Sequence, residues 1–335
     1  MMIPQAKHFL LALLLAAVTS TAAAQPFNVP ADYATISAAL ADTGTVVAGS
    51  TIIVGAGVVL EERFEVETAN ITLTTDAANP ATLRYAGDDF FPVIEVFADG
   101  FTIENFNIER NDTSSTGAQA IAIRKSNVTV RNTNITGTGN DPAPPAITVD
   151  HGLPGEGYAD DISGIEITGN TISGTFGWGI LIRSASNNGT INGIVVENNT
   201  IESSLGIAVF NPSGGPQNAV SGLSFQGNTL PSAPTSQVYD DMNTIDFLQF
   251  IADNTVDGAF IISEQQDPIV PVGIARRIYG QLATAADAAT DTQVIIEPLA
   301  GGGFNVYDSD GNLLSTVTPP ASVGGFAEPL FPAAP

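Results

Sequence analysis

One short pattern recurs through the middle of this chain and constrains its fold more than any other feature. Each copy is an alternating apolar strand, a tight turn rich in asparagine and glycine, and one further apolar residue. A looser copy, LQFIADNTV, begins at Leu248, and the clear copies are FTIENFNIE from Phe101, VTVRNTNIT from Val128, IEITGNTIS from Ile165, IVVENNTIE from Ile194 and LSFQGNTLP from Leu223. Self-similarity at such a period is the signature of a repeat fold, in which each unit buries its apolar face against its neighbours.

The turns of these copies share an asparagine. The apolar residue after the turn recurs from Ile108 to Val256 at spacings of 27, 37, 29, 29 and 26 residues. Two positions before it, four copies carry asparagine, at Asn170, Asn199, Asn228 and Asn254. If the turns stack in register, we expect these side chains to hydrogen-bond to one another along a column. Asparagine also tolerates the left-handed backbone that such a corner needs.

A second family of strands lies upstream of these copies. Its members are VIEVF from Val93, AIAIR from Ala120, AITVD from Ala146, GILIR from Gly179 and GIAVF from Gly206. Alternation puts the isoleucine and valine side chains of each strand on one face, which must be the core. Because the connections are too short for crossover helices, the strands are expected to stack as successive coils of a parallel β-helix.

The two ends of such a solenoid must be covered, or their unpaired backbone would recruit other chains. At the N-terminal end, YATISAALAD from Tyr33 places Ile36, Ala39 and Leu40 on one helical face. At the other end, the segment from Gly273 is expected to be helical and the segment from Phe304 to be a hairpin. We therefore expect a signal peptide at 1–24, a capped β-helix at 25–271, a small C-terminal cap or module at 272–320 and a Pro/Gly/Ala-rich tail at 321–335.

The first 24 residues have the pattern of a cleaved secretory signal, with an apolar run from Phe9 to Val18 and three alanines before Gln25. The protein is therefore expected to be secreted or periplasmic, with attachment to the cell surface as an open alternative, and no later segment is long enough to insert in a membrane. The net charge of −25 argues against nucleic acid as a partner. That charge fits either a saline habitat or a large number of Asp-rich turns. With no cysteine, the chain has neither disulfides nor thiolate metal sites.

The chain resembles the right-handed parallel β-helix proteins of the pectin-lyase-like superfamily. The resemblance is carried by YATISAAL, STIIVGAGVVLEERFEV and ITLTT, which are similar to the N-terminal cap and first coil of bacterial members, and it runs from about Tyr33 to Ser263. It implies an all-β fold, a right-handed parallel β-helix solenoid with an N-terminal capping helix and a small C-terminal helix/hairpin module. The superfamily contains lyases, hydrolases, esterases, epimerases and non-catalytic surface proteins, so the resemblance does not fix an activity.

The enzyme signatures of that superfamily do not transfer to this chain. Polygalacturonase-like members show NTD, DD, GHG and RIK in that order, whereas here Asp150-His151-Gly152 precedes Asp160-Asp161 and no RIK follows. The QDT and DFIFG stretches of pectin methylesterase-like members and the RxPxxR-like pattern of pectate lyases are absent. The sequence therefore leaves open whether the protein is an enzyme.

Candidate functional residues follow from placing the coils in register. The last residues of the upstream strands then form a column of Phe97, Arg124, Asp150, Arg183 and Phe210, with Lys125 and His151 at the next position. In this superfamily polysaccharides commonly bind on that face. Arginine side chains bind carboxylates, and aromatic rings stack on sugar rings. The sequence therefore predicts a binding site for a uronate-rich polysaccharide, formed by Arg124, Lys125, Arg183, Phe97 and Phe210. A simple cross-strand charge ladder is the alternative interpretation.

The loop HGLPGEGYADD makes this coil longer than its neighbours and supplies further candidates. His151 could act as a general base or acid oriented by Asp150, with Asp160 and Asp161 as paired acids, in a lyase or hydrolase. Alternatively, Glu156, Asp160 and Asp161 could hold calcium, the one cofactor that the sequence suggests. The competing hypothesis is a non-catalytic cell-surface or adhesive protein, and the oligomeric state is left open.

Overall fold

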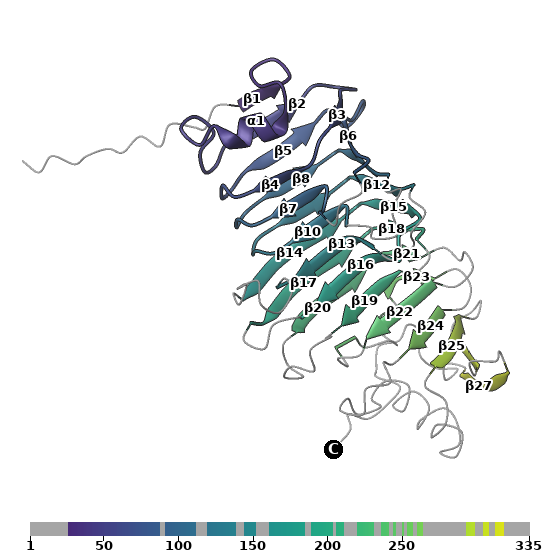
Figure 1. Cartoon of the computed structure of the whole chain (residues 1–335). Helices are drawn as coiled ribbons and strands as arrows, with labels where there is room; N and C mark the ends of the chain where they lie inside the picture. Colours follow the sequence, from purple (N-terminus) through teal and green to yellow (C-terminus); the bar gives the residue numbers. More distant parts are fainter. Residues whose placement is uncertain are drawn as a thin grey trace, which may run out of the picture.

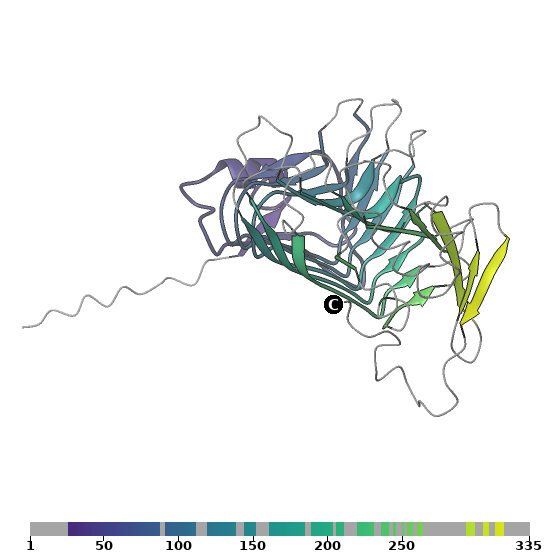
Figure 2. The same ribbon diagram turned by 90° about the horizontal axis from the view of Figure 1, so that it is seen from below.

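The chain winds into a solenoid whose coils contribute strands to three sheets (Figure 1). The structure is a computed structural model, and it describes residues 26–87, 91–111, 119–138, 144–151, 161–184, 189–203, 206–210, 220–230, 236–240, 244–245, 250, 253–256, 260–263, 293–298, 304–307 and 312–317. Strands of successive coils pair in parallel, as the repeat predicts. Seen from another side, the sheets wrap around one common axis (Figure 2).

The three sheets are here called A, B and C. Sheet A has the strand order β1 (Pro26–Val29), β2 (Thr51–Val54), β5 (Thr72–Thr75), β8 (Thr102–Glu104), β11 (Thr129–Arg131), β14 (Ile162–Thr168), β17 (Ile191–Glu197) and β20 (Val220–Gln226). Sheet B has the order β3 (Val59–Glu61), β6 (Thr82–Tyr85), β9 (Asn107–Arg110), β12 (Asn134–Gly137), β15 (Thr171–Gly174), β18 (Thr200–Ile201), β21 (Thr229–Leu230) and β23 (Thr255–Val256).

Sheet C contains the upstream strands of the sequence repeat and carries the candidate site. Its parallel part has the order β4 (Phe64–Val66), β7 (Ile94–Val96), β10 (Ile121–Ile123), β13 (Pro145–Asp150), β16 (Trp178–Arg183), β19 (Ile207–Phe210), β22 (Ser236–Asp240) and β24 (Phe260–Ser263). The sheet continues antiparallel through β25 (Gln293–Pro298), β26 (Phe304–Tyr307) and β27 (Leu313–Val317). The β26–β27 pair is the hairpin predicted from Phe304.

In sheet C, every second side chain of each strand points inward and contributes to the hydrophobic core. Ile121 pairs with Ile94 on one side and Ile147 on the other, and Ile123 continues the next inward row. These side chains are fully buried. A buried aliphatic side chain contributes about 1.5–3 kcal/mol, so the stacked rows supply much of the stability of a chain without disulfides.

The asparagine column has the arrangement that the repeat predicts. The Nδ2 atom of Asn170 donates to Asn199 Oδ1 at 3.0 Å, Asn199 Nδ2 donates to Asn228 Oδ1 at 2.9 Å, and Asn228 Nδ2 donates to Asn254 Oδ1 at 2.8 Å. Each Nδ2 also donates to a backbone carbonyl, and each Oδ1 also accepts a backbone N–H. Asn170, Asn199 and Asn228, which are at most 1% exposed, therefore have hydrogen-bond partners at both the nitrogen and the oxygen of the amide.

The left-handed corner residue is not the stacked asparagine, contrary to the expectation from sequence. It is the residue just before, with φ values of 65° at Gly169, 56° at Asn198 and 63° at Gly227. The two roles are separate because the stacked side chain must point inward while its predecessor turns the backbone. Either glycine or asparagine occupies the turning position, because these residues adopt this conformation at the least cost.

Helix α1 (Ile36–Ala41) lies within the segment predicted to cap the N-terminal end, and it packs beside β4. Its N-cap is Thr35, whose hydroxyl accepts from the Ala38 N–H at 3.0 Å. The Glu62 carboxylate accepts the Ile36 and Ser37 N–H groups at 2.9 and 3.0 Å. One acid at the end of the first coil thus anchors the helix.

Several predictions made from the sequence concern residues that the structure does not describe. They are the signal peptide at 1–24, the helix expected from Gly273 and the tail at 321–335. Among the described residues, no helix has the length and apolar character required to cross a bilayer.

Candidate functional site

Three neighbouring strands of sheet C bring the predicted charged residues into line. The register joins Ile123 of β10 to Val149 of β13, so Arg124 and Asp150 follow at the same level. Asp150 in turn pairs with Arg183 at the end of β16. Asp150 therefore lies between the two arginines, on strands separated by about 4.8 Å.

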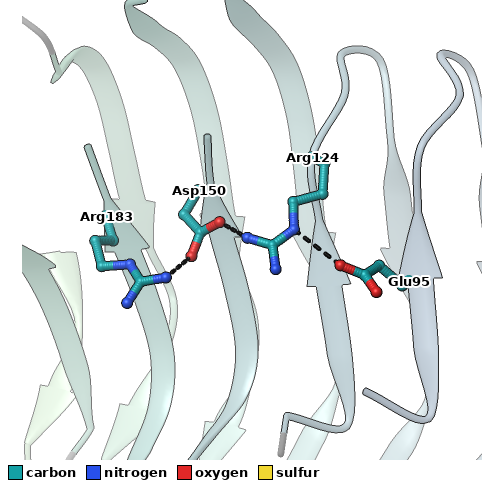
Figure 3. Close-up of polar contacts among 4 residues, drawn as sticks. All are labelled: Glu95, Arg124, Asp150 and Arg183. Atoms are coloured by element: carbon teal, nitrogen blue, oxygen red, sulfur yellow. Dashed lines mark hydrogen bonds and ion pairs between the residues drawn. The ribbon is translucent and has the colours of Figure 1, made fainter. Parts of the chain in front are cut away.

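The side chains form a continuous chain of ion pairs (Figure 3). Arg124 Nη1 contacts Asp150 Oδ1, and Arg183 Nη2 contacts Asp150 Oδ2. On its other side, Arg124 Nε donates to Glu95 Oε1 of β7 at 3.1 Å. We call Glu95, Arg124, Asp150 and Arg183 the arginine column.

The arginine column is largely shielded from solvent. The exposed fraction of the side chain is 0% for Asp150, 9% for Arg124, 12% for Glu95 and 19% for Arg183. Burying charged side chains to this extent destabilises the fold unless each has a partner of opposite charge. Removing one member of the column leaves the charge of its neighbour buried and unpaired. Arg183 offers the most accessible group of the column.

Phe97, Lys125 and Phe210 were predicted to flank this column. Phe97 follows β7 and Lys125 follows Arg124, and both side chains are half-buried. Phe210 is paired with Arg183 at the end of β19, which continues the column, but its side chain is outside the described part of the structure. Glu65 of β4 pairs with Glu95 and lies exposed at the N-terminal end of the same surface.

His151 follows Asp150 directly but belongs to a different environment. Its side chain is 2% exposed, and its Nε2 lies 3.2 Å from the carbonyl oxygen of Thr190, just before β17. A carbonyl can only accept, so this contact requires the proton on Nε2. The histidine thereby links the ends of sheets C and A.

Asp161 lies at the same corner and is also engaged with Thr190. Its carboxylate accepts the Thr190 N–H at 2.9 Å and the Thr190 hydroxyl at 2.8 Å. The backbone hydrogen bond, then the hydroxyl, and the nearby His151 hold the pKa of Asp161 below its ordinary value. Glu156 and Asp160, the other two residues predicted for calcium, lie outside the described residues, among which no group of three potential ligands could hold a metal ion.

Similar inter-coil ion pairs occur on the other two sheets. Arg131, which is close to Arg124 in sequence, lies on sheet A, where its Nε donates to Glu104 Oε2 at 2.6 Å. On sheet B, Arg84 contacts Glu109 at 2.6 Å and Glu61 at 3.1 Å. The arginine column differs from these pairs in its burial and its length.

Sequence reasoning missed Glu95. It sits one coil before Arg124 and two positions lower on its strand, opposite Ala122. The VIEVF strand does carry the signal, an acid at its central outward position. The contact between Glu95 and Arg124 forms because the long arginine side chain extends diagonally from one row of the sheet to another. Aligning the repeats shows which residues share a row, but it does not show such diagonal contacts.

Comparison with known proteins agrees with this architecture. Residues 94–248 match the protein family described as Right handed beta helix region. No curated protein matches the chain. Two solved structures are similar, a pectin methylesterase from Aspergillus niger (15% identity, 74% of this chain and 88% of that chain covered, TM-score 0.36) and an alginate lyase from Paenibacillus sp. str. FPU-7 (16% identity, 68% and 95% covered, TM-score 0.34).

At TM-scores below 0.5 neither structure supports an assignment of activity. The family match spans β7 to β22, a range that includes the arginine column and Asn170, Asn199 and Asn228 of the asparagine column. The chain is a right-handed parallel β-helix protein.

Proposed function

We propose that this protein is exported and binds extracellular polysaccharide along the arginine column without cleaving it. The observation that carries the proposal is the column itself, in which four consecutive coils each contribute one charged side chain to a continuous chain of ion pairs. Neighbouring strands of the column lie about 4.8 Å apart. A polymer lying along sheet C could contact Glu95 and Arg183, the two most exposed side chains of the column.

The chemistry of the surface supports a sugar ligand. Guanidinium N–H groups donate to sugar oxygens, and carboxylates accept from sugar hydroxyls. Phe97, half-buried at one end, offers an apolar face for stacking. Lys125, half-buried beside Arg124, adds a third cation at the edge of the column.

Binding without cleavage is favoured by the positions of the predicted acid–base residues. Asp150 holds two arginines and is fully buried, and the His151 ring is committed to the Thr190 carbonyl. Asp161 is likewise engaged with Thr190. A general acid or base must reach the proton that it transfers, and each of these groups is turned to a structural contact instead.

Affinity electrophoresis on gels containing single polysaccharides tests the binding. We expect retardation by at least one polysaccharide, and a dissociation constant raised about tenfold in Arg183→Gln, which is roughly 1.4 kcal/mol. Arg131→Gln on sheet A removes the same charge elsewhere and is expected to bind as the wild type does. Equal retardation of both variants would remove the arginine column from the binding site.

A second assay addresses cleavage. The same polysaccharides are incubated with the protein, with calcium and with chelator, and new reducing ends and unsaturated products are measured. We expect neither product. Product formation that is lost in His151→Gln would identify a lyase or hydrolase instead.

A further inference from the structure

The charges around the arginine column cancel. Along sheet C, from β4 to β16, the charged side chains on the described strands or just beside them are four carboxylates, at Glu65, Glu67, Glu95 and Asp150, and four cations, at Arg63, Arg124, Lys125 and Arg183. Within the column each arginine already faces a carboxylate. Within the part of the chain that the structure describes, this surface therefore offers many hydrogen-bonding groups but no net charge.

An anionic polymer would meet two obstacles at this surface. To take over an ion pair with Arg124 or Arg183, an incoming carboxylate must displace Asp150, which no solvent reaches. Displacing it would leave a buried charge without its partner. The whole protein also carries a net charge of −25, which repels anions over about 10 Å at moderate salt.

A neutral polymer meets neither obstacle. Sugar hydroxyls donate to carboxylate oxygens and accept from guanidinium N–H groups, so they can add to the partly exposed Glu95 and Arg183 side chains without displacing a charged partner. The pairs would then act as a fixed, preorganised set of donors and acceptors, which lowers the entropic cost of binding.

We propose that the polysaccharide bound along the arginine column is neutral, in contrast to the uronate-rich polymer that the arginines alone suggest. This inference rests on the proposed function, because it names the ligand class of the same site. The two ideas nevertheless fail under different results.

The sharpest test compares a neutral and an acidic polymer with the same sugar backbone, namely fully methyl-esterified polygalacturonan and de-esterified polygalacturonate. A neutral mannan and the acidic polymer alginate are measured beside them. Dissociation constants are measured at about 50 mM and 500 mM NaCl, where screening differs strongly. We expect a neutral polymer to bind at least tenfold more tightly than any acidic one at low salt. We also expect its affinity to change less than twofold with salt.

Two variants test whether the arginine column is responsible for the preference for a neutral polymer. Glu95→Gln leaves one cation of the column in excess and is expected to shift the ratio of acidic to neutral affinity at least threefold toward the acidic polymer. Glu104→Gln breaks the Arg131 pair on sheet A with the same change in net charge, and its ratio is expected to stay at the wild-type value. Circular dichroism and thermal unfolding establish that both variants fold, and the wild-type comparison decides the question without them.

Three results overturn the inference. Tighter binding of polygalacturonate or alginate, weakening as salt rises, would exclude a neutral ligand while leaving polysaccharide binding intact. A ratio that shifts equally in both variants would show that the overall field, and not the column, selects the ligand. If no polymer binds at either salt concentration, the proposed function fails and the inference fails with it.

Discussion

At the scale of single residues, the most constrained charge is Asp150. It is fully buried and ends β13 between two guanidinium groups, and through Arg124 it is linked to Glu95 (Figure 3). Such an arrangement is stable only while every member is present, because desolvation penalises any charge left alone. The column is therefore an anchor between four coils as well as the candidate binding surface.

Replacing Asp150 tests this dependence. Asp150→Asn removes the charge shared by both arginines, and we expect it to lower the free energy of unfolding by about 3–5 kcal/mol. The matched change Glu104→Gln breaks a pair whose arginine side chain is 49% exposed, and a loss below about 1 kcal/mol is expected there. Urea unfolding measures both. Similar losses in the two variants would mean that burial adds nothing to the column.

Asp161 gives a prediction about pH. Its folded pKa is lowered, first by the Thr190 N–H and then by the Thr190 hydroxyl, so its contribution to stability is present above the unfolded pKa. That contribution is lost as the pH falls through the folded pKa. Asp161→Asn should therefore flatten the decline of the urea midpoint on acidification below about pH 4, and Thr190→Val should flatten it partly. An acid-side decline unchanged in both variants would contradict this account.

Some residue contacts could be predicted from sequence and others could not. The repeat placed Asp150 between Arg124 and Arg183 because their position depends only on strand register. Glu95 escaped because its contact runs diagonally between rows. The burial of His151 escaped as well, because alignment cannot tell which way a side chain turns at the end of a strand.

At the scale of the coil, the turn between sheets A and B gives the stack its register. Each stacked asparagine joins its own turn to the next through two hydrogen bonds to a single Oδ1 atom. The residue before it supplies the left-handed bend. Asn198-Asn199 shows the division most clearly, since identical neighbouring residues perform the two tasks.

Truncating one member of the ladder should therefore be costly. Asn199→Ala leaves the Asn170 amide and the Asn228 oxygen without a shared partner in a buried turn, and we expect a loss of about 2–4 kcal/mol, since each orphaned group costs about 1–3 kcal/mol. Asn134→Ala removes an exposed contact to Asn107 and should cost less than about 0.5 kcal/mol. Thermal and urea unfolding of the two variants provide the comparison. Equal losses would show that the buried ladder does not hold the coils in register.

At the scale of the whole molecule, the architecture could be read from the repeat because period-2 alternation fixes the inward rows and the spacing fixes the stacking. The burial of the arginine column could not be predicted from the repeat. Alternation assigns Asp150 to the outside of the strand, and yet the folded chain covers it. Burial of an outward residue depends on neighbouring segments that the repeat does not describe.

The acidic character of the molecule also acts at this scale. Ion pairs bridge coils on all three sheets, so several of the few basic residues serve to join neighbouring coils. The remaining acids keep the solenoid strongly negative. The described surface of sheet C around the arginine column carries no net charge and so differs from the acidic molecule as a whole. For this reason we place the ligand there.

A crystal structure with a bound oligosaccharide, cut from the polymer that binds most tightly, tests the central claim most directly. Our account predicts a sugar chain lying along sheet C parallel to the solenoid axis, with one ring beside Phe97 and hydroxyls contacting Arg183. An oligosaccharide lying on sheet A or sheet B, or one that leaves the arginine column untouched, would contradict it.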